Sequence, residues 1–134
     1  MTETERSIFD SHVRREELLQ IKFELMGQML NPDTVKRIIE EHAWQSVYIY
    51  GGAYLGIQAC CAFRKFIDVA GIIDRAGELI MPRDDIEVIL PEELAKIDND
   101  LPIIITPLEH ARVIRDTLLK YREEERIFYL NELF

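Results

Sequence analysis

Hydrophobic residues follow a helical period in the first third of the chain. Within residues 5–30, four apolar residues recur at spacings of four, three and four: Leu19, Phe23, Met26 and Leu30. This spacing predicts an amphipathic helix. Asn31 then fits the N-cap and Pro32 the first position of a second, shorter helix. We therefore predict an N-terminal helical arm over residues 1–45.

After residue 46 the pattern changes to short, continuous apolar runs. The runs are VYIY (47–50), VAGII (69–73), PIIIT (102–106) and IFYL (127–130). The segments between them predict helices over residues 54–65, 91–97 and 107–123. Continuous apolar strands are typical of a parallel sheet that helices cover on both faces. We therefore predict an α/β fold: a small Rossmann-like three-layer domain with a mostly parallel sheet over residues 46–134.

Residues 78–90 break this alternation of strands and helices. Turn-forming residues from Pro82 to Asp85 separate two short apolar pieces. A hairpin or an irregular excursion fits this segment better than a crossover helix.

The first predicted strand runs directly into a glycine-rich turn, GGAYLG. Gly51 and Gly56 occupy the first and third glycine positions of the dinucleotide-binding pattern GxGxxG, and Gly52 lies between them. Ala53 replaces the second glycine, whose missing side chain lets a phosphate approach the backbone closely. A helix N-terminus after such a turn attracts phosphate. Glycine at a strand-to-helix turn also has a purely geometric use, and this alternative stays open.

An acid follows the second predicted strand at the distance that the same pattern requires. Asp74 lies 23 positions after Gly51 and could bond ribose hydroxyls. Arg75 comes next and could instead favour a 2′-phosphate or another anion. Thr106 ends the third main strand and Glu109 and His110 follow it, at the sheet edge where open α/β sheets bind ligands.

Residues 46–134 resemble the Rossmann-like N-terminal domain of bacterial nucleotide-sugar-modifying proteins, which include sialic-acid-type sugar O-acyltransferases and nucleotide-sugar dehydratases. The resemblance rests on five ordered stretches: VYIYGGAYLG, VAGIID, IEVILPEEL, LPIIIT and IFYLNELF. It implies a nucleotide or nucleotide-sugar cleft at Gly51, Gly52, Ala53 and Gly56, with Asp74 as the polar anchor. Ala53 and Arg75 depart from the residues usual in such domains.

Charge and composition exclude several other classes of function. The net charge of -9 and a sequence pI near 4.8 disfavour binding to nucleic acid or anionic lipid. No apolar segment is long enough to span a membrane, and the first residues lack the features of a signal peptide. Cys60 and Cys61 are expected to be buried thiols of a cytoplasmic protein. The sequence shows no metal motif and no catalytic triad or Tyr-Lys pair.

These observations predict a nucleotide-binding module without catalytic apparatus of its own. Its ligand would be a dinucleotide such as NAD(P) or a nucleotide sugar. The alternative is an assembly module with a vestigial cleft that forms a homodimer through its N-terminal helices. The apolar stripe in EELLQIKFELMGQML could serve such a dimer or pack back on its own domain.

Overall fold

The protein is an α/β fold built on one parallel sheet. The computed structural model describes the backbone of residues 2–134 and the side chains of Thr2 and of residues 14–134. The strands are β1 (Ser46–Tyr50), β2 (Asp68–Ile73), β3 (Val88–Ile89), β4 (Ile103–Ile105) and β5 (Ile127–Tyr129). They pair in the order β3-β2-β1-β4-β5, and every neighbouring pair is parallel. This confirms the predicted fold class.

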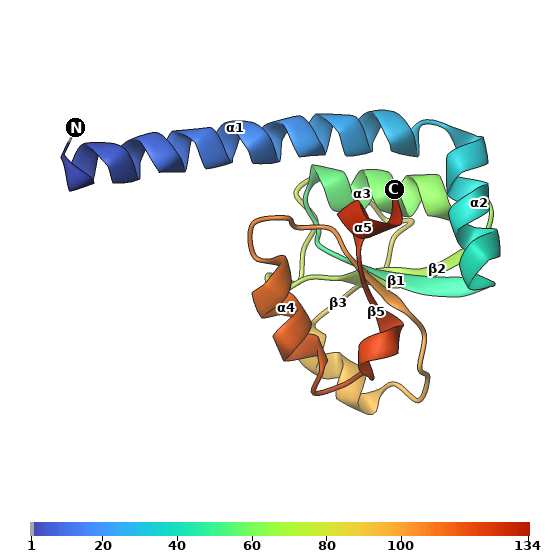
Figure 1. Ribbon diagram of the computed structural model, residues 1–134. Coiled ribbons are helices and arrows are strands. Elements are labelled where there is room, and N and C mark those ends of the chain that lie inside the picture. The colour runs from blue at the N-terminus through green and yellow to red at the C-terminus, as the bar shows by residue number, and fades with distance from the viewer. Residues whose placement is uncertain (1) are drawn as a thin grey trace.

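Helices cover both faces of the sheet. They are α1 (Glu3–Met29), α2 (Pro32–His42), α3 (Tyr54–Phe63), the 3-10 helix η1 (Pro91–Lys96), α4 (Ala111–Leu118), the 3-10 helix η2 (Glu124–Arg126) and α5 (Leu130–Leu133). In Figure 1, α3 lies between α1 and the sheet, whereas α4 lies on the opposite side. The long α1 runs across the top of the molecule and its N-terminal part extends beyond the body.

Alternate residues of the central strands enter two separate hydrophobic cores. Val47 and Ile49 of β1 pack into the core beneath α1, α2 and α3. Tyr48 and Tyr50 pack with Leu118 of α4 in the second core. The apolar runs are continuous because both faces of the sheet are buried, as their sequence predicted.

The face of α1 that packs on the body differs from the apolar stripe in its sequence. Leu25 and Met29 are the buried residues, while the stripe of Leu19, Phe23, Met26 and Leu30 is exposed. The Gln58 side-chain amide of α3 donates to the Met26 carbonyl oxygen over 2.9 Å and holds the two helices together. The stripe therefore remains available on the surface of α1.

Three predicted segments differ from the expected structure or are shorter than expected. The segment before β3 is irregular, and β3 pairs in parallel with β2, so the hairpin alternative was wrong. The helix predicted over 91–97 is a 3-10 turn that starts at Pro91. The helix predicted over 107–123 is regular only from Ala111 to Leu118.

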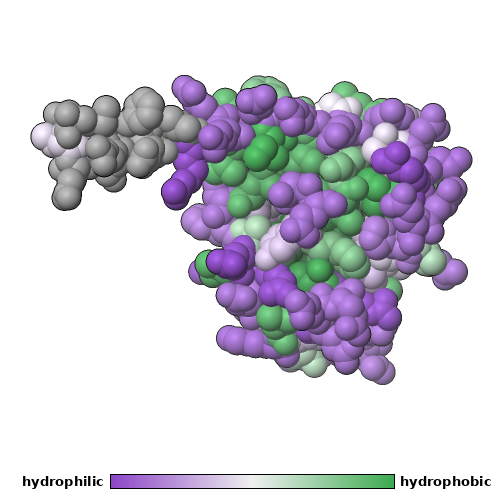
Figure 2. All heavy atoms as spheres, in the orientation of Figure 1, coloured by the Kyte–Doolittle hydropathy of each residue, from purple (hydrophilic) through white to green (hydrophobic). Residues whose placement is uncertain are grey.

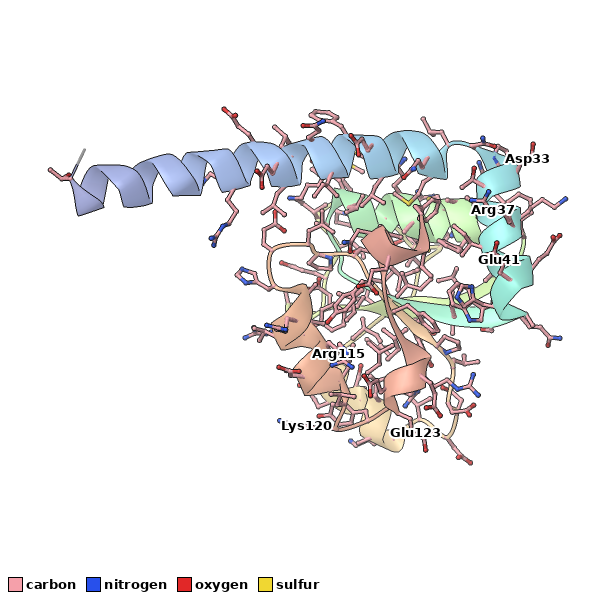
Figure 3. The ribbon with its side chains drawn as sticks, viewed as in Figure 1. Asp33, Arg37, Glu41, Arg115, Lys120 and Glu123 are labelled. Atoms are coloured by element: carbon pink, nitrogen blue, oxygen red, sulfur yellow. The ribbon has the colours of Figure 1, made fainter. Side chains whose placement is uncertain are left out.

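The surface away from α1 is mainly polar. Asp33, Arg37 and Glu41 lie along the outer side of α2 at helical spacing (Figure 3). Figure 2 shows apolar atoms gathered beneath α1 and over the middle of the visible face, with polar atoms over α2 and the lower rim. None of the described helices combines the length and the hydropathy that a membrane crossing requires.

The two neighbouring cysteines are free thiols in different surroundings. Cys60 is buried and Cys61 is half-buried. Burial raises the pKa of the Cys60 thiol to about 11, so this group stays protonated at neutral pH. The expectation of unpaired thiols is confirmed, with only one of them fully buried.

Candidate functional site

The candidate site lies at the carboxyl end of the sheet, at the point where the connections from two neighbouring strands leave toward opposite faces. After β1 the chain turns into α3 on one face, and after its neighbour β4 it turns into α4 on the other face. In open α/β sheets, ligands bind in the crevice at such a switch point. Gly51 and Thr106 are the residues that follow these two strands.

Gly51 and Thr106 pack closely against each other at this point. Gly51 has a φ of +115°, and a Cβ there would lie 2.5 Å from the Thr106 hydroxyl oxygen. The Thr106 hydroxyl donates to the Tyr50 carbonyl oxygen over 2.7 Å and is buried. Thr106 thus joins the ends of β1 and β4, and its predicted contact with a ligand stays a prediction.

The other two glycines of the turn allow close approaches between backbone segments. A Cβ on Gly56 would lie 1.8 Å from the Gly51 carbonyl oxygen, so the first turn of α3 packs against the end of β1 only without a side chain. A Cβ on Gly52 would lie 2.7 Å from the Glu78 carbonyl oxygen. Ala53, in contrast, is exposed in extended backbone before α3, where its methyl group is accommodated.

Asp74 ties this turn to the loop after β2. One of its carboxylate oxygens accepts from the Gly52 N–H over 2.8 Å, and the other accepts from the Ala76 N–H over 2.8 Å. Asp74 follows the second strand, as the sequence predicted, but the sequence could not reveal these backbone partners. Each carboxylate oxygen has a second lone pair, and the predicted bond from Asp74 to a ligand hydroxyl stays a prediction.

The N-terminus of α3 has unused hydrogen-bond donors. Ala53 is the N-cap and supplies no side-chain bond, and the Ile57 N–H is the first that bonds back to the Ala53 carbonyl oxygen. Among the described residues, none accepts from the N–H groups of Tyr54, Leu55 or Gly56. Such amides, together with the positive end of the helix dipole, favour an anion.

A large cavity opens beside the turn on the α4 side of the sheet. Its volume is about 940 Å³, which falls in the range of small-molecule sites. Its polar lining consists of Tyr50, Asp74, Arg75, Glu92, His110, Thr117 and Tyr121. Residues that follow β1, β2, β3 and β4 all line this cavity. It therefore brings together Gly51, Asp74 and Arg75, three of the site residues that the sequence predicted.

Arg75 lines this cavity, and its guanidinium is available to a ligand. It is exposed and makes no hydrogen bond or ion pair with the described part of the chain. His110 is exposed at the N-cap position of α4, at the same cavity. Glu92 follows β3, and sequence reasoning missed it because that strand has only two residues. Pro91 directly before it was the one available signal of a strand end.

A second cavity lies on the α1 side of the turn. Its volume is about 360 Å³, and its lining is mainly apolar: Leu19, Phe23, Met26, Tyr54 and Leu55, with Ala53 and Gly56 of the turn. An ion pair between Lys22 and Glu109 joins two residues of this lining. Pro107 lines both cavities, so they adjoin across the switch point. Sequence reasoning missed this cavity, because it requires α1 to pass over the start of α3.

The described residues contain no cluster of histidine, cysteine, aspartate or glutamate that could hold a metal ion. Comparison with protein-family models, with curated proteins and with solved structures finds no match to this chain. Its function is therefore inferred from the residues and geometry of the molecule itself.

Proposed function

We propose that this chain is a Rossmann-like module that binds a nucleotide at the carboxyl edge of its sheet, without catalytic groups of its own. The ligand would be a dinucleotide such as NAD(P) or a nucleotide sugar, with its phosphates over the turn at Gly51 and the start of α3. The observation that carries the proposal is the set of unused N–H groups at residues 54–56, at the switch point where two cavities adjoin.

The two adjoining cavities also support a ligand with two parts. A pyrophosphate that crosses the switch point would place one group in the larger cavity and extend the other toward α1. Arg75 at the rim of the larger cavity would add a charged donor for a phosphate. The carboxylates of Asp74 and Glu92 would accept hydrogen bonds from the hydroxyl groups of a ribose or another sugar.

Binding is expected to depend on Arg75. We expect the wild-type chain to bind at least one of NAD, NADP and UDP-glucose. We expect Arg75→Ala to weaken that binding about ten- to a hundredfold, because a hydrogen bond to a charged group contributes about 1.5–3 kcal/mol. Arg75 has no hydrogen-bond or ion-pair partner among the described residues, so its removal should leave the free energy of unfolding unchanged. Isothermal titration calorimetry measures the affinity.

Arg37→Ala is the matched control, since Arg37 is an exposed arginine whose ion pair with Glu41 lies on α2. It should bind like the wild type. Failure of all three ligands to bind the wild-type chain would rule out the proposal. Equal affinities for Arg75→Ala and Arg37→Ala would remove Arg75 from the site.

A second candidate function, homodimer assembly through α1, is favoured by the exposure of its apolar stripe. Leu30 is 74% exposed and Phe23 is 65% exposed, and Leu19 and Met26 continue the same stripe. Apolar side chains in a continuous row on one helix are typical of an interface rather than of a solvated surface. The occupant that we propose is the α1 of a second copy.

Replacing Phe23 and Met26 together by glutamine tests this candidate. We expect the double variant to weaken dimer association at least tenfold, because large side chains at an interface centre dominate its energy. Gln28→Ala on the same helix is the control and should leave association unchanged. Sedimentation equilibrium is the measurement, and a wild-type chain that stays monomeric at every concentration would contradict the candidate.

A further inference from the structure

Two tyrosines on β1 have similar burial but different hydroxyl partners. Tyr48 and Tyr50 lie two residues apart in the same strand, pack in the same core, and are 5% and 4% exposed. The Tyr48 hydroxyl accepts a hydrogen bond from the Asn99 side-chain amide over 3.2 Å. The Tyr50 hydroxyl has no hydrogen-bond partner among the described residues. It is not one of their fully buried unpaired atoms either, so the hydroxyl oxygen is accessible although the ring is buried.

The Tyr50 hydroxyl faces the larger cavity. Tyr50 contributes to the lining of that cavity, next to Gly51. Burial raises the pKa of this hydroxyl, while Arg75 lowers it and Asp74 and Glu92 raise it. All three charged residues line the same cavity, so the hydroxyl lies on the cavity side of the ring. It remains protonated at neutral pH and can donate a hydrogen bond.

We infer that the Tyr50 hydroxyl contacts the ligand directly and donates a hydrogen bond to a neutral oxygen on the group that the ligand carries beyond its phosphates. This inference rests on the proposed function. The acceptor is a sugar hydroxyl in a nucleotide sugar or an amide carbonyl in a nicotinamide dinucleotide. Both offer the same acceptor chemistry to Tyr50. Tyr121 and Ile114 would supply the apolar wall against which the ring of that group lies.

The main reason for this assignment is that the Tyr50 hydroxyl, in the lining of the cavity, has no hydrogen-bond partner in the part of the chain that the structure describes. A hydroxyl without a partner in the fold gives no stability that phenylalanine would not also give, because the ring packing is the same in both residues. At Tyr48 the hydroxyl has a use within the fold, through Asn99, which also accepts from the guanidinium of the buried Arg122 over 2.8 Å. The Tyr50 hydroxyl instead serves to bind the ligand in the cavity.

The experiment combines each tyrosine variant with full and truncated ligands. Calorimetry would measure the affinities of wild type, Tyr50→Phe and Tyr48→Phe for UDP-glucose, UDP, NAD and ADP. For whichever full ligand binds, we expect Tyr50→Phe to weaken it about three- to tenfold, the value of one neutral hydrogen bond. The truncated ligand, which lacks the acceptor, should bind Tyr50→Phe and wild type equally. The responding pair tells whether the group that Tyr50 contacts is the sugar of a nucleotide sugar or the nicotinamide riboside of a dinucleotide.

Thermal unfolding without ligand supplies the second readout. Tyr48→Phe should lower the midpoint because it breaks the bond to Asn99, yet leave binding unchanged. Tyr50→Phe should not lower it. Equal affinities of Tyr50→Phe and wild type for the full ligand would overturn the inference, as would an equal loss for full and truncated ligands. A wild-type chain that binds none of the four overturns the proposed function as well.

Discussion

Gly56→Ala is expected to destabilise the protein by about 3 kcal/mol, the upper end of the cost of overpacking a tight interior site. The added Cβ would lie 1.8 Å from the Gly51 carbonyl oxygen and 3.1 Å from the Thr106 hydroxyl oxygen. The first obstacle is backbone and cannot rotate away, so α3 would have to move off the end of β1. Urea unfolding followed by circular dichroism would measure the loss.

Gly27→Ala is the matched control for this substitution. Gly27 lies within α1, and a Cβ there would meet nothing within 4 Å. Alanine should therefore leave stability unchanged or raise it by up to about 1 kcal/mol through its higher helix propensity. Similar unfolding free energies for Gly56→Ala and Gly27→Ala would show that α3 does not approach β1 as closely as described.

Asp74→Ala should cost about 2 kcal/mol of stability, because it leaves the Gly52 and Ala76 N–H groups without their acceptor. Bonds to a carboxylate are stronger than neutral ones, but the side chain is half-buried and water can replace part of the loss. Chemical denaturation of the ligand-free chain would measure it.

Asp68→Ala at the other end of β2 is the matched control. Asp68 is exposed, and its carboxylate accepts from the Ser46 hydroxyl over 3.0 Å. Its removal should cost no more than about 0.5 kcal/mol. If Asp74→Ala were no more destabilising than Asp68→Ala, the carboxylate of Asp74 would not hold the turn. Because Asp74 supports the fold, Arg75 and Tyr50 are the better residues for testing ligand binding.

The elements that could be predicted from the sequence are those whose pattern of apolar residues matches the burial of these residues in the fold. The strands around Ile49, Ile72 and Ile104 are apolar on both faces because the sheet is buried on both faces. The turn from Gly51 to Gly56 was recognisable because the close approaches within it require glycine. In these segments a residue's neighbours in the chain carry most of the information about its structure.

Other elements could not be predicted because partners far away in the chain decide them. The sequence of α1 has apolar residues on more than one side, and the surface of α3 selects Leu25 and Met29 as the buried ones. Strand β3 has two residues and exists through its pairing with Ile72 and Ile73 of β2. The local spacing of hydrophobic residues predicts neither the buried face of α1 nor the presence of β3.

The candidate site was predictable in its outline and not in its bonding. Gly51, Asp74 and Arg75 do meet at one cavity, as their positions at strand ends predicted. The bonds from Asp74 to backbone N–H groups and the unpaired hydroxyl of Tyr50 depend on loop geometry that no spacing rule contains. Tyr50 and Tyr48 both lie in the apolar run VYIY, and nothing in that run distinguishes the one whose hydroxyl bonds within the fold from the one that lines the cavity.

A titration of the 15N-labelled chain with UDP-glucose and with NAD, followed through backbone amide resonances, tests the proposed site most directly. For the ligand that binds, we predict the largest shifts at residues 51–56 and 74–76. Residues 54–56, with the unused amides of α3, line the smaller cavity, and Gly51 and residues 74–76 line the larger one. Residues 99–101, before β4 at the opposite edge of the sheet, should not shift. Shifts centred anywhere else, or none with either ligand, would contradict the nucleotide site.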